Sequence, residues 1–232
     1  MNSTLAVLTL LPWLDWLGLG VFFGSWAGYV YFAKTGETRS VLAATNAVRR
    51  EWMVQTTYRE VRVVDGVVIQ NLSSSPSFFA STTILIIGGL LAVLGSDKAN
   101  ELVRDLPFAA RTTTLIFDLK LILLLGIFVY AFFRFTWAMR QYTFGALLIA
   151  AAPEAGRFIS EGLSRDLFAD KAGRVVGLAA ETFNDGLRGY YFAFAAIGWF
   201  FSPVLFILAT VGVVYILYQR EFHSEVLSVL TS

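Results

Sequence analysis

The sequence contains no cysteine and a single histidine, His223. These absences exclude disulfides, iron–sulfur clusters, thiolate zinc sites and a haem held by two histidines. A catalytic triad could use His223 alone, and no nucleophile with a positioned base can be named. We therefore expect a protein with no metal, no cofactor and no enzyme activity.

Charged residues are also scarce. They make up 15% of the 232 residues, against 56% hydrophobic residues and a mean hydropathy of +0.65. A soluble domain carries about a quarter charged residues, so this balance is typical of a membrane protein. Eighteen basic and 17 acidic residues leave a net charge of +1, which argues against a nucleic-acid partner.

Four apolar stretches approach the roughly 20 residues that a spanning helix requires. They predict an all-α, polytopic integral membrane protein that forms a single membrane domain over residues 1–232. A further apolar stretch, 142–152, is too short to span and continues the third helix, with a re-entrant segment as the alternative. The four predicted spans are residues 10–33, 78–95, 115–133 and 190–217.

The distribution of lysine and arginine predicts the orientation, since basic loops stay on the cytoplasmic side. The regions 34–77 and 134–189 hold most of the basic residues, and both are predicted to be cytoplasmic and helical. Both termini are then expected on the non-cytoplasmic side of a bacterial inner (plasma) membrane.

Breaks and periodicities refine these regions. Apolar residues at helical spacing predict an amphipathic helix over about 38–61, and residues 61–69 fit either a helix or a hairpin that turns at Asp65 and Gly66. Ser75 and Pro76 resemble a cap and first helical position that open the second span. Pro203 is expected to kink the fourth span.

Long stretches of the chain closely resemble one protein family. They are SFFASTTILIIGGLLAVLG at 77–95, LKLILLLGIFVYAFFRFTWAMRQY at 119–142, FNDGLRGYYFAFAAIGWF at 183–200 and YQREFHSEVL at 218–227. The chain is similar to the bacterial and plant membrane proteins catalogued as domain of unknown function, number 599. That resemblance implies a multi-span helical protein and brings no established activity, so it implies no catalytic residues.

Small residues recur every fourth position in two of the spans. Gly20, Gly24 and Gly28 form a stripe along the first span, and Gly88 and Ala92 repeat the pattern in the second. Such stripes let two helix backbones approach closely in a membrane. Packing within one subunit, packing between subunits and the lining of a narrow pore are the three interpretations.

Ionisable residues inside a membrane are candidate functional groups. Asp118 and Lys120 lie near the outer end of the third span, on roughly opposite helix faces, and Asp15 lies at a similar depth in the first. We expect Asp15 and Lys120 to form a structural ion pair, with a proton or ion relay as the alternative.

Five arginines are candidate contacts for anions or lipid headgroups on the cytoplasmic side, where the membrane surface is negatively charged. Two of them, Arg134 and Arg140, flank Trp137 at the end of the third span. The five are Arg49, Arg50, Arg134, Arg140 and Arg188.

Two functions fit these features. The first is a homo-oligomer that forms an ion or small-solute pathway, necessarily between subunits because no span carries a periodic polar stripe. The alternative is a non-catalytic accessory or scaffold subunit that packs against a larger membrane complex or binds anionic lipid. Membrane lipids are expected partners in both cases.

Overall fold

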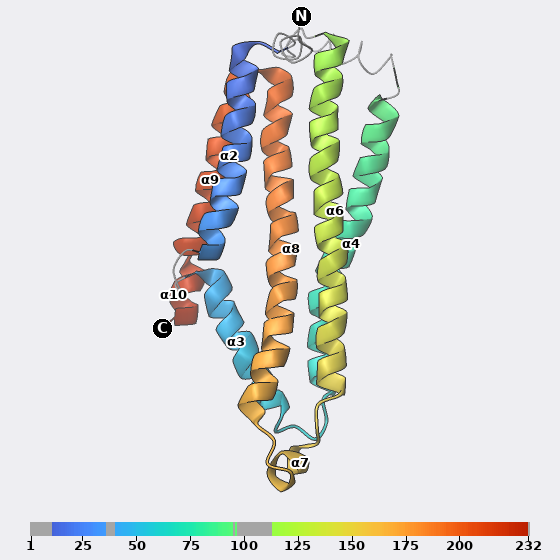
Figure 1. Ribbon diagram of the computed structural model, residues 1–232, viewed down its shortest axis with the longest axis vertical. Coiled ribbons are helices and arrows are strands. Elements are labelled where there is room, and N and C mark those ends of the chain that lie inside the picture. Colours follow the sequence, from blue (N-terminus) through green and yellow to red (C-terminus); the bar gives the residue numbers. More distant parts are fainter. Residues whose placement is uncertain (1–10, 36–39, 95, 97–112, 232) are drawn as a thin grey trace, which may run out of the picture. The chain divides into compact units, whose positions relative to one another are not determined.

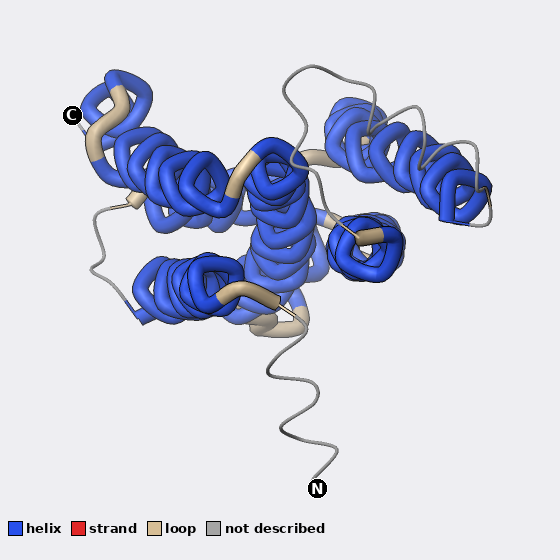
Figure 2. Tube along the Cα trace, turned by 90° about the horizontal axis from the view of Figure 1, so that it is seen from above, coloured by secondary structure: helices blue, strands red, loops and turns tan. Residues whose placement is uncertain are grey.

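The computed structural model describes residues 11–35, 40–94, 96 and 113–231, and in these residues the regular secondary structure is entirely helical (Figures 1 and 2). The all-α class is therefore confirmed. The described helices are α2 (Trp13–Thr35), α3 (Val41–Thr56), α4 (Val63–Leu94), α6 (Thr114–Ala150), α7 (Ala155–Ser160), α8 (Arg165–Phe201), α9 (Pro203–Phe222) and α10 (Glu225–Thr231).

The chain divides into two compact units. The first unit comprises Met1–Gly36, Thr83–Ala131 and Leu187–Tyr218, and the second comprises Glu37–Thr82, Phe132–Gly186 and Gln219–Ser232. The described part of the first unit contains α2 and the adjoining parts of α4, α6, α8 and α9. The second unit contains α3, α7, α10 and the remaining parts of α4, α6, α8 and α9.

Aromatic side chains form the core of the first unit. Trp26 stacks on Phe192 with ring centroids 4.9 Å apart, and Phe22 meets Phe192 edge to face at 5.4 Å. Trp199 stacks on Phe206 at 5.3 Å. These pairs join α2 to α8 and α8 to α9, and each buries far more apolar area than an aliphatic pair would. The interior of this bundle is thus filled by rings.

The predicted fourth span, residues 190–217, is two helices and not one. α8 ends at Phe201 and α9 starts at Pro203, and a Cβ atom built on Gly198 would lie 3.3 Å from the Leu205 carbonyl oxygen. Residues seven positions apart in a continuous helix are separated by roughly 10 Å, so the chain reverses here. The expectation of a kink at Pro203 was therefore wrong (Figure 1).

Local chemistry explains the reversal. The Ser202 hydroxyl accepts a hydrogen bond from the Leu205 N–H at 3.0 Å, which is the N-cap interaction. Pro203 then occupies the first helical position, where its missing N–H costs nothing. Hydropathy alone cannot distinguish such a hairpin from one long apolar helix.

Neighbouring contacts fix the directions of the helices in the first unit. Trp199 of α8 meets Asp15 at the start of α2, whereas Arg188 lies over Tyr29 near its end, so α8 is antiparallel to α2. α9 is parallel to α2, because Tyr29 donates a hydrogen bond to the Leu217 carbonyl at 3.1 Å and Gly18 faces Phe206.

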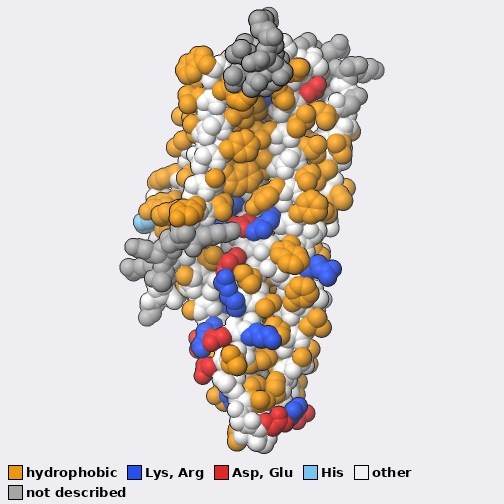
Figure 3. Space-filling view, viewed as in Figure 1, with side chains coloured by type: hydrophobic (Ala, Val, Ile, Leu, Met, Phe, Trp, Pro, Cys, Tyr) orange, Lys and Arg blue, Asp and Glu red, His pale blue; other side chains and the backbone are white. Residues whose placement is uncertain are grey.

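Three described helical stretches, and not the predicted four, are long and apolar enough to cross a membrane. α2 falls outside this set because tryptophan, tyrosine and glycine lower its hydropathy. Figure 3 shows hydrophobic side chains covering the drawn face of the first unit, while charged side chains gather on the second unit. The three stretches are Val63–Leu94, Thr114–Ala150 and Pro203–Thr231.

α4 corrects one further expectation and decides between two alternatives that the sequence left open. It runs unbroken through Pro76, so Ser75 and Pro76 do not open a helix, and residues 63–69 are helical rather than a hairpin. Pro76 removes one backbone donor from the helix interior. The hydroxyls of Ser73 and Ser74 donate to the carbonyls of Gln70 and Asn71 at 3.1 and 2.7 Å, which supplies hydrogen bonds beside the interruption.

α6 confirms that residues 142–150 continue the third helix, since it extends without a break for 37 residues to Ala150. The expected cytoplasmic helix over about 38–61 is α3, which is shorter and ends at Thr56. α3 is capped by Ser40, whose hydroxyl accepts from the Ala43 N–H at 3.1 Å.

The C-terminal helix α10 packs on α3 within the second unit. In addition, the backbone N–H of Leu42 donates to Glu221 at 3.1 Å, so a carboxylate lies at the N-terminus of α3. α3 belongs to the 34–77 region. The distribution of basic residues predicts this region and the C-terminal segment on opposite sides of a membrane, whereas α3 and α10 are in contact.

Glycines permit the closest helix contacts in the second unit. A Cβ atom on Gly186 would lie 2.5 Å from the fully buried Phe135 ring, whereas one on Gly212 would meet nothing within 4 Å. We predict that Gly186→Ala lowers the free energy of unfolding by about 1–3 kcal/mol through overpacking.

Gly212→Ala is the matched control, because it makes the same change at an open helical position. It should raise stability by up to about 1 kcal/mol. Thermal unfolding of the detergent-solubilised protein, followed by circular dichroism, measures both effects, and equal melting temperatures for the two variants would contradict the close contact.

Candidate functional site

Three polar side chains meet inside the first unit. The Trp199 indole N–H donates to the carboxylate of Asp15, and the Lys120 ammonium donates to the Trp199 backbone carbonyl at 2.7 Å. Lys120 is 2% exposed, Trp199 2% and Asp15 5%. Asp15 and Lys120 thus both bind Trp199, and the expected direct ion pair between them is not among the contacts of the described residues.

Helix ends explain the position of both charges. Asp15 lies in the first turn of α2, and Lys120 binds a carbonyl in the last turn of α8. Negative charge is favourable at a helix N-terminus and positive charge at a C-terminus. The ammonium also lies 5.4 Å from the Trp199 ring centroid and 5.8 Å from that of Phe200, within range for cation–π attraction.

Asp118 does not join this cluster. It is half-buried on α6, and the contacts of the described residues connect Lys120 to Trp199 rather than to Asp118. Asp15 is the acidic residue whose charge acts on Lys120. The arrangement favours a structural role, because the charges are engaged at the reversal between α8 and α9.

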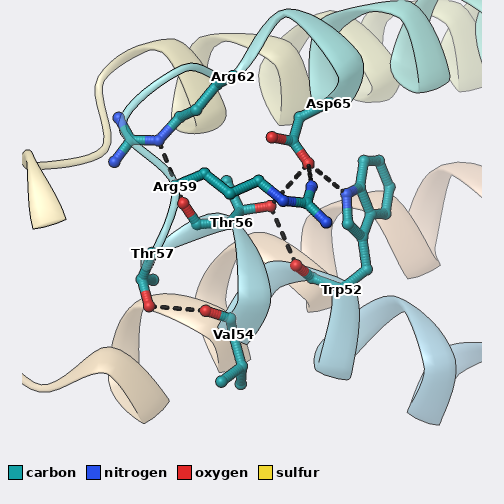
Figure 4. Close-up of polar contacts among 7 residues, drawn as sticks. All are labelled: Trp52, Val54, Thr56, Thr57, Arg59, Arg62 and Asp65. Atoms are coloured by element: carbon teal, nitrogen blue, oxygen red, sulfur yellow. Dashed lines mark hydrogen bonds and ion pairs between the residues drawn. The ribbon is translucent and has the colours of Figure 1, made fainter.

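A second polar cluster surrounds Asp65 in the second unit (Figure 4). One carboxylate oxygen accepts hydrogen bonds from the Trp52 indole at 2.7 Å and the Thr56 hydroxyl at 3.0 Å, and it pairs with Arg59. Asp65 is 0% exposed, and its other oxygen accepts no hydrogen bond from a described residue. This cluster holds the end of α3 against the start of α4.

Two arginines close the loops beside this cluster. Arg62 donates to the carbonyls of Thr56, Ala152 and Pro153, which ties the α3–α4 turn to the segment after α6. Figure 4 shows its contact with Thr56.

Arg165 donates to the Thr57 and Ala155 carbonyls and lies 4.1 Å from the Tyr58 ring centroid. The guanidinium groups of Arg62 and Arg165 thus bind backbone carbonyls at helix ends and in the segments between helices.

The sequence analysis missed this site. An isolated carboxylate in the valine-rich run VVDGVV was a usable signal, because a charge within an apolar helical face requires a partner. It was obscured by the Asp65-Gly66 pair, which also fits a turn.

α3 and α8 pack closely where Gly173 and Gly177 face α3. A Cβ on Gly173 would lie 3.1 Å from the Arg50 Cα, and one on Gly177 would lie 2.9 Å from the Asn46 side chain. Asn46 connects to both helices, because its amide donates to Glu181 at 3.3 Å and its oxygen accepts from Arg49 at 2.7 Å. The described side chains around it form a shallow polar pocket of about 210 Å³.

The pKa values of the two adjacent arginines on α3 are shifted in opposite directions. Burial lowers the pKa of Arg49, and nearby Tyr142 and Glu181 partly oppose that effect. The hydrogen bond to Asp170, together with Asp166, raises the pKa of the exposed Arg50. Both side chains are engaged, so neither presents an open anion site.

The five predicted arginines do not form one site. Arg134 pairs with Asp185, and Arg188 lies 5.4 Å from the Tyr29 ring centroid in the first unit. Arg140 is exposed, and its guanidinium lies 5.9 Å from the Phe144 ring centroid. Each arginine therefore has its own local environment.

The predicted glycine stripes are not the sites of close packing within the chain. A Cβ atom on Gly20, Gly24, Gly28 or Gly88 would meet nothing within 4 Å, and Ala92 is exposed. Of the interpretations made from the sequence, close packing inside one subunit is not supported at these glycines. Contact with a second subunit stays a prediction.

Among the described residues, no group of three or more histidine, cysteine, aspartate or glutamate side chains is placed to hold a metal ion. Two apolar grooves lie in the first unit. One, between α2 and α6, has a volume of about 910 Å³, and the other, between α2 and α9, about 610 Å³.

The fold and its apolar helices suggest a helical protein embedded in a membrane. Comparison with family models identifies the family: the model described as "Protein of unknown function, DUF599" matches residues 17–226. The chain belongs to this family, which confirms the resemblance found in the sequence. No curated protein and no solved structure matches the chain.

The Asp15–Trp199–Lys120 cluster yields a prediction. Lys120→Met removes the cation and leaves Asp15 buried without it, so the free energy of unfolding should fall by about 3–5 kcal/mol. The double variant Asp15→Asn/Lys120→Met should recover most of this loss, because asparagine still accepts the Trp199 hydrogen bond.

Thermal unfolding in detergent measures the three variants. If Lys120→Met were as stable as the native protein, the structural role of the cluster would be refuted and the relay interpretation would gain support.

Proposed function

We propose that the protein is a multi-pass membrane protein that assembles as a homo-oligomer through the outward face of α2. The glycine stripe on that face carries the proposal. Gly20, Gly24 and Gly28 are all exposed, and a Cβ on each would point into open space. They follow one another at i, i+4 and i+8, so they share one side of the helix.

The physical argument concerns what drives helices together in lipid. Lipid tails are as apolar as leucine, so association depends on dense packing rather than on hydrophobicity. Small residues permit that packing because two backbones can approach closely and form weak Cα–H hydrogen bonds. A stripe of glycines that faces outward does not contribute to close packing between the helices of one chain.

Large side chains flank the stripe. Phe23, Tyr31 and Phe32 are exposed by 52%, 72% and 46%, and the two apolar grooves lie on either side of α2. One helix face thus offers both protrusions and hollows. A two-fold symmetric contact needs such a self-complementary surface, because each copy supplies the same residues.

Any pathway for ions or small solutes would lie between the subunits of this oligomer. The first unit is filled by stacked rings, and its buried charges Asp15 and Lys120 are bound at helix ends. This supports a closed single bundle. We propose no catalytic role.

The proposed orientation revises the one expected from the sequence. α3 and α10 pack together, and the 34–77 region that contains α3 is rich in arginine. Since basic segments stay inside, we place α3 and α10 on the cytoplasmic side of a bacterial plasma membrane and the start of α2 on the outer side.

Gly24→Leu tests the assembly. Leucine at this position would block close approach of a second helix and should convert the oligomer to monomers. Folding should be retained or slightly improved, because leucine is the better helix former. Light scattering of the detergent-solubilised protein measures the mass of the particle.

Gly212→Leu is the matched control, since it places the same side chain at another open helical glycine. It should leave the oligomer intact. A native protein that is monomeric, or one that purifies in fixed ratio with other polypeptides, would refute the proposal, and the second result would favour an accessory subunit.

The orientation is tested with single cysteines, which the cysteine-free sequence makes unambiguous. Thr4→Cys should react with an impermeant thiol reagent in intact cells. Ser228→Cys on α10 should react only after lysis. Labelling of Ser228→Cys from outside would contradict the cytoplasmic position of α10.

A further inference from the structure

An outward stripe of apolar side chains runs along α6 in the second unit and contains one cation. Phe133, Trp137, Phe144 and Leu147 are exposed by 64%, 48%, 39% and 61%. Arg140 is exposed in the middle of this stripe. The spacing of these residues keeps them on one side of the helix.

Arg140 differs from the arginines around it. Arg134 pairs with Asp185, Arg50 with Asp166 and Asp170, and Arg59 with Asp65. Arg140 forms no ion pair with any residue that the structure describes, and its guanidinium lies over the Phe144 ring. Trp137 meets Phe144 edge to face at 6.4 Å, so the three side chains form a cluster.

An exposed guanidinium within an apolar stripe is a candidate for binding an anion from outside the chain. α6 is among the helices that are long and apolar enough to cross a membrane, so we expect its outward side chains to meet lipid tails or headgroups. Arginine on such a helix extends toward the headgroups, and tryptophan is enriched at the same level. Arginine also binds phosphate oxygens in a bidentate manner.

We propose that Arg140, together with Trp137 and Phe144, binds the phosphate of an anionic phospholipid. The guanidinium supplies charge and hydrogen bonds to the phosphate, while the two rings contact the glycerol and the upper part of the acyl chains. Net negative charge on the lipid distinguishes it from a zwitterionic lipid, because one unopposed cation favours a net anion.

The experiment is a titration of the detergent-solubilised full chain with phosphatidylglycerol, read by native mass spectrometry. Arg140→Gln should weaken binding about five-fold, the effect of one basic residue at a membrane surface. Arg140→Lys should retain part of the affinity, because it keeps the charge and loses the planar fork. Trp137→Ala should weaken binding as well.

Arg157→Gln is the matched control. It removes the same charge from an exposed arginine that pairs with Glu161 on α7. It should leave phosphatidylglycerol binding unchanged, and phosphatidylcholine should bind the native protein more weakly.

Equal binding by native protein and Arg140→Gln would overturn the proposal. So would displacement of the lipid by millimolar inorganic phosphate, since that would indicate a site for soluble anions.

Discussion

The reversal of the chain at Ser202 and Pro203 determines the arrangement of the first unit. It turns an apolar stretch that could have been one crossing into two antiparallel helices, and so brings α9 beside α2. With α9 parallel to α2, Tyr29 donates to the Leu217 carbonyl in the first unit, and within the second unit Glu221 binds the N-terminus of α3. Without the reversal, neither contact could form.

Several interactions converge to hold this turn in place. The stacked Trp199 and Phe206 rings close it from within, and Lys120 from α6 binds the Trp199 carbonyl that the end of α8 leaves without a helical partner. Asp15 fixes the indole of the same tryptophan. Buried charged groups are weak evidence for net stability, but their hydrogen bonds to Trp199 join α2, α6 and α8 at the turn.

Sequence patterns predicted the helical class, the continuous α6 and the proximity of Asp15 and Lys120, because these depend on hydropathy and depth alone. They failed where the same pair of residues occurs in two different structures. Ser-Pro caps a new helix at Ser202, yet α4 continues through Ser75 and Pro76. Tertiary packing decides between these outcomes. Likewise, glycine spacing marked Gly24, which is open, while the contacts fall at Gly173 and Gly186.

Most charged side chains of the described residues lie in the second unit, and many of them are paired there. The second unit neutralises its charges locally: Asp65, Asp185 and Asp170 each pair with an arginine. For the buried carboxylates of Asp65 and Asp185, loss of the arginine would cost several kcal/mol, whereas the exposed Asp170 depends less on its partner. Where the described residues offer an arginine no carboxylate, as at Arg140, the lipid phosphate that we propose would take its place. In a protein with 15% charged residues, an unmatched cation on an apolar face therefore carries more information than any paired one.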